Sequence, residues 1–559
     1  MKKFVLDIYN TVSTNRKYHF WIFLIILAML GVWMVYCYSQ SYGHDFFFHE
    51  RRFNALTEAL QNGTFPYYTD YLAINGYGYF TKGFYPDFIL IPFALIDVVS
   101  GYHYGYTIMI YTMTILCGIF MYKMIISIRN NTFVASVAAI LYTYSCYRVL
   151  DVYRRAALGE ALSFTFLPIV FLGLYHIIKG DYKKWYVIAI GFALLILTHV
   201  ISSILMFVTL IIFLAIYHRD LLKEPKRIYY LILAGIVTVP LAAYYLFPFL
   251  EQFQSNTFYF ETLPAAEVAD STLPFTDMVW ALFYGIIQYE QFFIPALGIL
   301  LSGVIFTRIF IYAKSNQLKT ADTLAIIGIA YLIAVMPFFP WNIFPFSLLN
   351  IIQLPWRLFE FVTFFFSISG AYYLFLLLTT RKRKHIGYLA VIVFSALLMV
   401  SDGVDVRNKT VRLREDMTPT VENKYNLIGM EYMPAKVPSL EYPNDRGDTI
   451  ISKQGYSDIS DFKRKESIIS FNKQSDKDDE LELPLLYYKG YAAYIGNQSL
   501  LVKESDNGLV EITVNESGNV KVYYKGTIIQ KLGFYITILS AILLCIYIFV
   551  YRKKRTSKI

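Results

Sequence analysis

Long apolar segments recur along this 559-residue chain and constrain its fold more than any other feature. A helix needs about 20 predominantly apolar residues to cross a bilayer, and about twelve segments of the chain approach that length. We predict transmembrane helices near residues 20–38, 105–127, 132–148, 159–178, 185–199, 200–217, 228–248, 291–312, 322–340, 356–379, 385–401 and 532–551. The composition agrees, because only 16% of the residues are charged, whereas a soluble globular protein has about 25%.

The apolar stretch 86–101 is short and is interrupted by Asp97, so we predict an interfacial or re-entrant helix there instead of a crossing. With this assignment and an N-terminus inside the cell, the basic loops fall on the cytoplasmic side, as the positive-inside rule expects. Examples are 123–129, 381–384 and the tail 552–558. We therefore predict a multi-pass cell-membrane protein with cytoplasmic N- and C-termini. The net charge of +9 reflects this topology and does not indicate nucleic acid as a partner.

Composition divides the chain into three regions. Residues 1–401 form the predicted transmembrane domain, with 39–85 as its first outside loop, and 532–559 hold the final transmembrane helix and a basic cytoplasmic tail. Residues 402–531 are polar and contain the alternating runs LVEITV and VKVYYKG near Asn-Gly and Ser-Gly turn signals. Alternation with period two between turns is typical of antiparallel β-strands. We therefore predict a small extracytoplasmic β-rich domain before the last helix.

The first outside loop places His44 and Asp45 directly after the first predicted crossing. Residues 46–60 carry apolar side chains at helical spacing, so we expect a helix on the membrane surface immediately after Asp45. A carboxylate at such a boundary is partly desolvated, which suits it to general-base catalysis. Aspartate is also a good N-cap residue, and capping this helix is the alternative role for Asp45.

A second polar cluster lies between the third and fourth predicted crossings, on the outer side. It contains Arg148, Asp151, Arg154, Arg155 and Glu160. Short arginine-rich loops normally lie inside the cell, so arginines that run against this trend suggest an anion-binding site. Arginine donates paired hydrogen bonds that match a phosphate group. The alternative is a web of salt bridges, Arg148 with Asp151 and Arg154 with Glu160, that only ties the helix ends together.

Two further polar positions occur at predicted outer helix ends. His199 lies between the fifth and sixth crossings, and Trp356 and Arg357 enter the tenth. A polar residue within an apolar run often marks a cavity, although a lone histidine is more often a packing residue. Arg357 could extend to lipid headgroups or bind a lipid phosphate. The sequence has no P-loop, GxGxxG, GxSxG or HExxH motif, and its four cysteines lie in or beside apolar segments, so no thiolate metal site is expected.

Segments along nearly the whole chain carry a family resemblance. They are GHDFFFHERRFNALTEALQNGTFP, NGYGYF, FYPDFILIPFAL, YRVLDVYRRAALGEAL, THVISS, LPWR, IGMEYMP and LPLLYYKGYAAY. In this order they resemble the YfhO-like family of bacterial membrane proteins, which is similar to glycosyltransferases of the GT-C fold. The resemblance implies a GT-C-like polytopic helical domain that works at the outer membrane face. It also implies a polyprenyl-phosphate sugar lipid as donor and a cell-surface polymer, such as teichoic acid or another cell-wall glycan, as acceptor.

The resemblance also suggests roles for individual residues. Asp45 matches the acidic residue that GT-C enzymes carry in the first outside loop, and Asp151 or Glu160 could fill their second, less fixed acidic position. These three residues are the expected catalytic group. The expected substrate-binding residues are His44, Arg148, Arg154, Arg155, His199, Trp356 and Arg357. The resemblance supplies no firm metal motif and is compatible with a divalent cation as cofactor.

Two other functions fit parts of the sequence. A transporter or flippase of lipid-linked glycans would need polar residues through the bilayer midplane and often an internal repeat, whereas the charges here gather at the outer helix ends. A non-catalytic scaffold of surface-polymer assembly would explain the β-rich domain but not the outward-facing arginine, aspartate and histidine residues. We therefore favour an inverting membrane glycosyltransferase, with membrane lipids as its surroundings.

Overall fold

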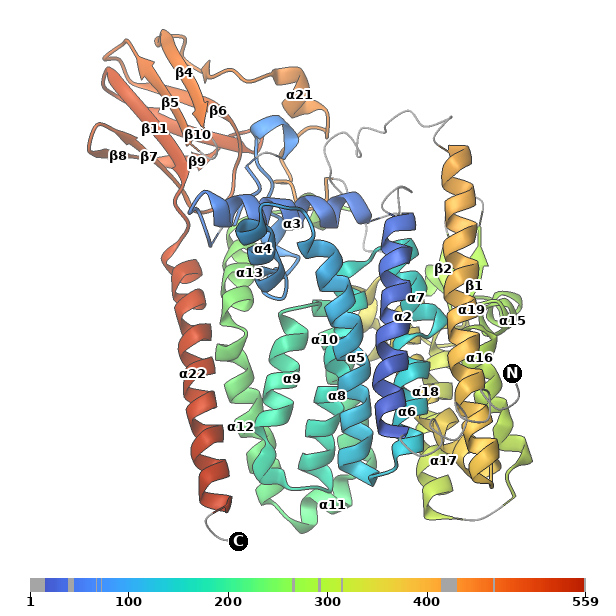
Figure 1. The fold of residues 1–559 in the computed structure, drawn as a ribbon. Coiled ribbons are helices and arrows are strands. Elements are labelled where there is room, and N and C mark those ends of the chain that lie inside the picture. Colours follow the sequence, from blue (N-terminus) through green and yellow to red (C-terminus); the bar gives the residue numbers. More distant parts are fainter. Residues whose placement is uncertain are drawn as a thin grey trace. The chain divides into compact units, whose positions relative to one another are not determined.

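The computed structural model describes residues 16–556 except for 39–44, 67, 72, 264–266, 290–292, 313–314, 414–429 and 466–467 (Figure 1). The chain forms two compact units. The helical unit comprises Met1–Phe46, Tyr106–Gly235 and Ala266–Asp416, and the mixed unit comprises Phe47–Gly105, Ile236–Ala265 and Met417–Ile559. Each unit therefore combines segments that are distant in sequence, and the mixed unit takes parts of all three predicted regions.

Seven helical segments of the described chain are long and apolar enough to cross a membrane, or eight if the bent pair α12 (Lys226–Leu241) and α13 (Ala243–Ser255) counts as one span. They are Gly105–Arg129, Thr132–Arg155, Leu158–Ile178, Asn316–Ala334, Pro355–Leu377, Arg381–Val404 and Ile528–Lys553. The predicted count of about twelve is not confirmed. The difference arises because several predicted crossings form shorter apolar helices, among them Phe20–Met34, Val200–Ile216 and Gly298–Phe310.

The stretch that contains Asp97 forms α4 (Ile91–Ser100), a helix of 10 residues. At a rise of about 1.5 Å per residue, such a helix spans about 15 Å, which is half the thickness of a hydrocarbon core. Its end is fixed by Asp97, because the carboxylate oxygen accepts a hydrogen bond from the backbone nitrogen of Gly105 at 2.6 Å. The helix is thus too short to be a full crossing.

The helical unit is built from two groups of elements. Its long helices are α2 (Arg16–Tyr38), α5 (Gly105–Arg129), α6 (Thr132–Thr143), α8 (Leu158–Ile178), α9 (Tyr186–Ile196), α10 (Val200–Ile216), α17 (Asn316–Ala334), α18 (Phe359–Leu377) and α19 (Arg381–Leu413). Its shorter elements are α7 (Cys146–Leu150), α11 (His218–Lys223), α15 (Phe275–Phe283), α16 (Gly298–Phe306) and the hairpin β1 (Ile286–Gln288) and β2 (Phe293–Pro295).

Helices α6, α8 and α18 form the core of this unit, since most of each is buried inside the protein. A Cβ atom on Gly173 of α8 would lie 2.3 Å from the backbone nitrogen of Ile188, so glycine permits the close approach of α8 and α9. The rings of Phe171 and Phe364 stack with centroids 4.0 Å apart and join α8 to α18. Close backbone contact therefore joins α8 to α9, and aromatic stacking joins α8 to α18.

The mixed unit contains α3 (Phe46–Gln61), α4, α13, α14 (Tyr259–Thr262), α21 (Tyr442–Arg446) and α22 (Ile528–Thr556). Its strands are β3 (Ile451–Ser452), β4 (Ile459–Lys465), β5 (Ile468–Lys473), β6 (Asp479–Leu486), β7 (Tyr491–Ile495), β8 (Gln498–Leu500), β9 (Val502–Glu504), β10 (Leu509–Val514) and β11 (Gly518–Tyr524). They form two antiparallel sheets, in the orders β3-β6-β10-β9 and β4-β5-β11-β7-β8. The β-rich region before the last helix is confirmed, and both alternating runs of the sequence are strands.

Apolar side chains from both sheets share one core, which includes Phe471, Leu483, Ile512 and Val522. A second core joins residues 68–80 to 430–442 and to the end of β6, with Tyr77 and Tyr488 fully enclosed. This second core explains why the predicted first outside loop and the β-rich region belong to one compact unit.

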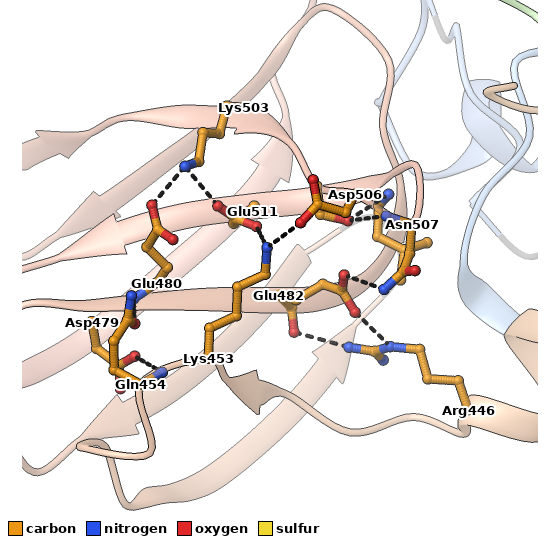
Figure 2. A network of polar contacts seen from close by, with 12 residues as sticks. Arg446, Lys453, Gln454, Asp479, Glu480, Glu482, Lys503, Asp506, Asn507 and Glu511 are labelled. Carbon is orange, nitrogen blue, oxygen red and sulfur yellow. Dashed lines mark hydrogen bonds and ion pairs between the residues drawn. The ribbon is translucent and has the colours of Figure 1, made fainter. Parts of the chain in front are cut away.

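Polar contacts tie the edge of one sheet together (Figure 2). Lys453 and Lys503 approach the two carboxylate oxygens of Glu511 at 2.6 Å and 2.8 Å. Arg446, at the end of α21, pairs with Glu482 of β6 at 3.1 Å, and both side chains are less than 5% exposed. Buried charges of this kind are held in place by their partners, because an unpaired charge inside a protein is costly.

Candidate functional site

The residues between α7 and α8 form a tight polar turn. Ser145 caps α7, and α7 continues into a five-residue π-helical turn, Asp151–Arg155. Ala156 then adopts a left-handed conformation with φ of 58°, and α8 begins at Leu158. Such π-turns occur frequently at functional sites. The turn reverses the chain, so that Asp151, Arg155 and the first turn of α8 face one another.

Arg155 is the centre of an ion-pair cluster. Its Nη1 atom lies 2.9 Å from an oxygen of Asp151 and 2.9 Å from an oxygen of Glu160. Arg357 approaches the same oxygen of Glu160 at 3.6 Å, and the hydroxyl of Tyr147 donates a hydrogen bond to the other oxygen. Asp151 is completely buried and Glu160 is 2% exposed. Two arginines therefore neutralise two buried carboxylates at one point.

The cluster also contains Trp356 and Asp45. The guanidinium of Arg155 lies over the ring of Trp356, 4.6 Å from the ring centroid. The backbone nitrogen of Asp45 donates to the carbonyl oxygen of Arg155 at 3.2 Å, and the Asp45 charge acts on both Arg155 and Asp151. Asp45 is half-buried and directly precedes α3. Positions 45, 151, 155, 160, 356 and 357 of the chain thus meet in one place.

The two arginines of the cluster differ in how their donors are used. Arg155 uses Nη1 for both carboxylates, and no described residue accepts a hydrogen bond from its Nε or Nη2. Arg357 donates from Nη1 to the carbonyl oxygen of Ile352 at 2.7 Å, which holds its side chain at the entrance to α18. Both side chains remain slightly accessible, at 13% and 12%. Arg155 can therefore offer a free edge to an anion.

A hydrogen-bonded chain extends the site from His199 to Glu360. His199 caps α10, and its Nδ1 atom lies 2.8 Å from the hydroxyl of Ser202. The hydroxyls of Ser202 and Ser163 both donate to Glu360, the former at 2.7 Å. His199 in turn packs against Gly159, next to Glu160. The predicted site residue His199 is thereby connected to a carboxylate that sequence reasoning did not single out.

Glu360 is completely buried in the first turn of α18. The signal that could have identified it is a single acidic residue within the apolar run FEFVTFFF, because an ionisable group inside a membrane helix is costly and usually functional.

Three helix N-termini point their polar ends into this cluster. Glu160 lies in the first turn of α8, His199 caps α10 and Glu360 lies in the first turn of α18. The N-terminus of a helix carries a partial positive charge and free backbone N–H groups. The position is therefore favourable for the buried carboxylates and for an added anion.

Two predicted site residues, Arg148 and Arg154, lie elsewhere. Arg148 is 2% exposed, and its guanidinium donates to the Thr143 carbonyl at 2.8 Å and to the Thr114 hydroxyl at 3.2 Å. It ties α7 to α6 and α5 and does not face the cluster. Arg154 pairs with Asp402 at 3.5 Å and covers the ring of Phe293. His44 lies outside the described residues.

The expected salt-bridge web is present in a different form from the one proposed from the sequence. Arg155, and not Arg148 or Arg154, pairs with both Asp151 and Glu160. Within the described ranges, no group of three histidine, cysteine or acidic side chains is arranged to hold a metal ion.

Comparisons with known proteins give one similar sequence and one similar solved structure. No family model matches the chain. An uncharacterized protein of Lactococcus lactis subsp. cremoris (strain MG1363) is 24% identical over 602 residues, which cover 97% of this chain and 97% of the relative. Among solved structures, the archaeal oligosaccharyltransferase AglB from Archaeoglobus fulgidus, in complex with an inhibitory peptide and a dolichol-phosphate, is similar with a TM-score of 0.35 and 10% identity. The match covers 75% of this chain and 60% of that protein.

Proposed function

We propose that this protein is a membrane glycosyltransferase. It transfers a sugar from a polyprenyl-phosphate-linked donor to a cell-surface polymer, such as teichoic acid or another cell-wall glycan, at the outer face of the cell membrane. The observation that supports this most is the convergence of Asp45, Arg155 and Arg357 at the start of α8 and α18. A base can take the proton of the acceptor, and cationic groups can stabilise the departing phosphate, in such a transfer.

In the proposed reaction, a carboxylate oxygen of Asp45 takes the proton of the acceptor hydroxyl. The acceptor oxygen forms a bond to the anomeric carbon of the donor sugar, and the bond from that carbon to the phosphate oxygen breaks. Arg155 and Arg357 stabilise the negative charge that grows on the departing lipid phosphate, which is commonly the largest contribution in such chemistry. A single displacement of this kind inverts the anomeric centre.

The buried carboxylates then have positioning roles. Asp151 and Glu160 hold the guanidinium of Arg155 from one side, so its remaining N–H groups are directed away from them. Trp356 supports the face of the same guanidinium. Fixing donors before the reaction avoids reorganisation in the transition state, so this support contributes to the rate.

The arrangement fits a transferase better than a transporter. Glu160, Ser163, Ser202 and Glu360 all lie within the first two turns of their helices, and their mutual contacts place them at one end of those helices. A transport path would require polar groups distributed across the membrane midplane. A non-catalytic scaffold would have no need for a buried network of this kind.

The test is an assay of the purified full-length protein with a polyprenyl-phosphate sugar and a glycerol phosphate polymer. Release of free polyprenyl phosphate together with sugar on the polymer would support the transferase. Movement of the intact donor across proteoliposome membranes without its cleavage would instead support a flippase.

Replacing Arg357 by alanine should weaken donor binding more than acceptor binding. The expected loss is about 1.5–3 kcal/mol, because one hydrogen bond to a charged phosphate is removed. The measurement is the apparent affinity for polyprenyl-phosphate sugar, with the acceptor affinity as the internal comparison. An unchanged donor affinity would mean that the donor phosphate binds Arg155 without Arg357.

The proposed topology places 402–531 outside the cell and both termini in the cytoplasm. A cysteine in place of Asp506, whose side chain is 94% exposed, should react with a membrane-impermeant maleimide in intact cells. The matched control, Lys553→Cys near the end of α22, should react only after lysis. The reverse labelling pattern would invert the topology and place the proposed site on the inner face.

A further inference from the structure

The mixed unit contains a cavity that the proposed reaction does not use. Its volume is about 500 Å³, which lies within the range of small-molecule sites. It is lined by the loop after α3, by the end of β11 and by the first turns of α22. Ten of its thirteen lining residues precede α22, so the cavity belongs mainly to the loops of the unit and not to the membrane-spanning helix.

The lining combines aromatic rings with lysines. The aromatic members are Phe65, Tyr68, Tyr71, Tyr524, Phe534 and Tyr535. Lys525 and Lys531 are both exposed, and no acidic residue among those that the structure describes lines the cavity. The cavity therefore offers flat apolar faces and positive charge.

The aromatic walls are held rigidly. Tyr68 donates from its hydroxyl to the Gln530 carbonyl at 3.1 Å, and the Gln530 side chain donates to the Tyr524 hydroxyl at 2.9 Å. Tyr524 donates onward to the Lys489 carbonyl at 2.8 Å, while Phe65 meets Phe534 edge to face. Fixed walls reduce the entropy lost on binding, so this cavity is organised before a ligand arrives.

We propose that this cavity binds a phosphorylated carbohydrate or polyol. Aromatic rings stack on the C–H faces of such molecules, and lysines bind their phosphates as point charges. The identity of the ligand as a segment of the acceptor polymer rests on the proposed function, whereas the binding itself does not.

The experiment measures binding of a synthetic glycerol phosphate hexamer to the full-length protein in neutral-lipid nanodiscs by calorimetry. Lys531→Ala and Tyr535→Ala should each weaken binding by roughly tenfold or more, since each removes a charged contact or a stacking face. Lys521→Ala, which removes another exposed lysine, on β11 and outside the cavity, should bind as the wild type does. Affinity should also fall as salt rises.

Equal affinity of Lys531→Ala, Tyr535→Ala and wild type would overturn the proposal. Displacement of the hexamer by phosphatidylglycerol in the nanodisc would also overturn it, and would assign the cavity to a lipid headgroup. Asp45→Asn separates the two proposals, because it should bind the hexamer normally. The wild type could bind the hexamer but release no polyprenyl phosphate from a donor. That result would overturn the proposed function and support the binding site in the cavity.

Discussion

Asp45→Asn should give a folded, membrane-inserted protein whose turnover of a polyprenyl-phosphate sugar is lower by about 10²–10⁴-fold, the usual contribution of a general base. Asparagine has nearly the same shape and caps a helix about as well as aspartate, so the start of α3 should be unaffected. The substitution removes the proton acceptor and the charge that acts on Arg155 and Asp151. The measurement is the initial rate of polyprenyl phosphate release.

Size-exclusion profiles and the melting temperature provide the folding control for Asp45→Asn, and both should match the wild type. His44→Ala should reduce the rate less, since His44 would at most orient its neighbour. A near wild-type rate for Asp45→Asn would show that Asp45 only caps α3. Glu160 and Asp151 would then be the next carboxylates to test.

The sequence correctly predicted those helices and strands in which apolar side chains recur at regular spacing. The run LVEITV became β10, and residues 46–60 became α3, because alternation and helical spacing report which face of an element is buried. The number of crossings was harder to predict. Hydropathy identifies an apolar segment, but the segments at 185–199 and 200–217 form helices of 11 and 17 residues, and His199 caps the second of them.

The meeting of Asp45, Arg155 and Arg357 was predictable only in part. Their placement near predicted outer helix ends suggested one face, but the choice of Arg155 over Arg148 depends on the π-turn. That turn directs Arg155 towards Asp151 and Glu160, while Arg148 at the end of α7 is enclosed by Thr143 and Thr114. No periodicity in the sequence specifies a π-turn, so neighbouring arginines could not be distinguished.

Glu360 was missed for a different reason. The charged residues singled out from the sequence lie at predicted helix ends, whereas Glu360 lies inside the predicted crossing 356–379. The structure begins α18 at Phe359, so Glu360 lies in its first turn and receives hydrogen bonds from Ser163 and Ser202. Buried carboxylates of this kind are recognised by partners that come from other helices, and those partners are known only once the helices are packed.

The pairing of Arg446 with Glu482 leads to the largest expected effect on stability. Arg446→Ala should lower the free energy of unfolding of the mixed unit by about 3–5 kcal/mol, because Glu482 would remain buried without its cation. The guanidinium also donates to the Tyr77 hydroxyl at 3.2 Å and to the Thr449 carbonyl at 2.8 Å, so four parts of the unit lose a shared contact. The Asn507 amide is the other donor to the Glu482 carboxylate, at 3.0 Å, and it supplies no charge.

The six tryptophans all lie in segments of the helical unit, so their fluorescence does not report on Arg446. The measurement is instead the alkylation rate of a cysteine at Ala493, a completely buried position of β7, followed by peptide mass spectrometry across a denaturant series.

Lys453→Ala is the matched control. Lys453→Ala should lower the free energy of unfolding by no more than about 1 kcal/mol. Lys453 is 30% exposed, and Glu511 keeps its second partner, Lys503, at 2.8 Å. The double variant Arg446→Met with Glu482→Leu should recover most of the loss, since it removes both charges and keeps the volume. The cysteine at position 493 could be alkylated no faster in the Arg446→Ala variant than in the Lys453→Ala variant. That result would show that the buried ion pair does not hold α21 and β6 together.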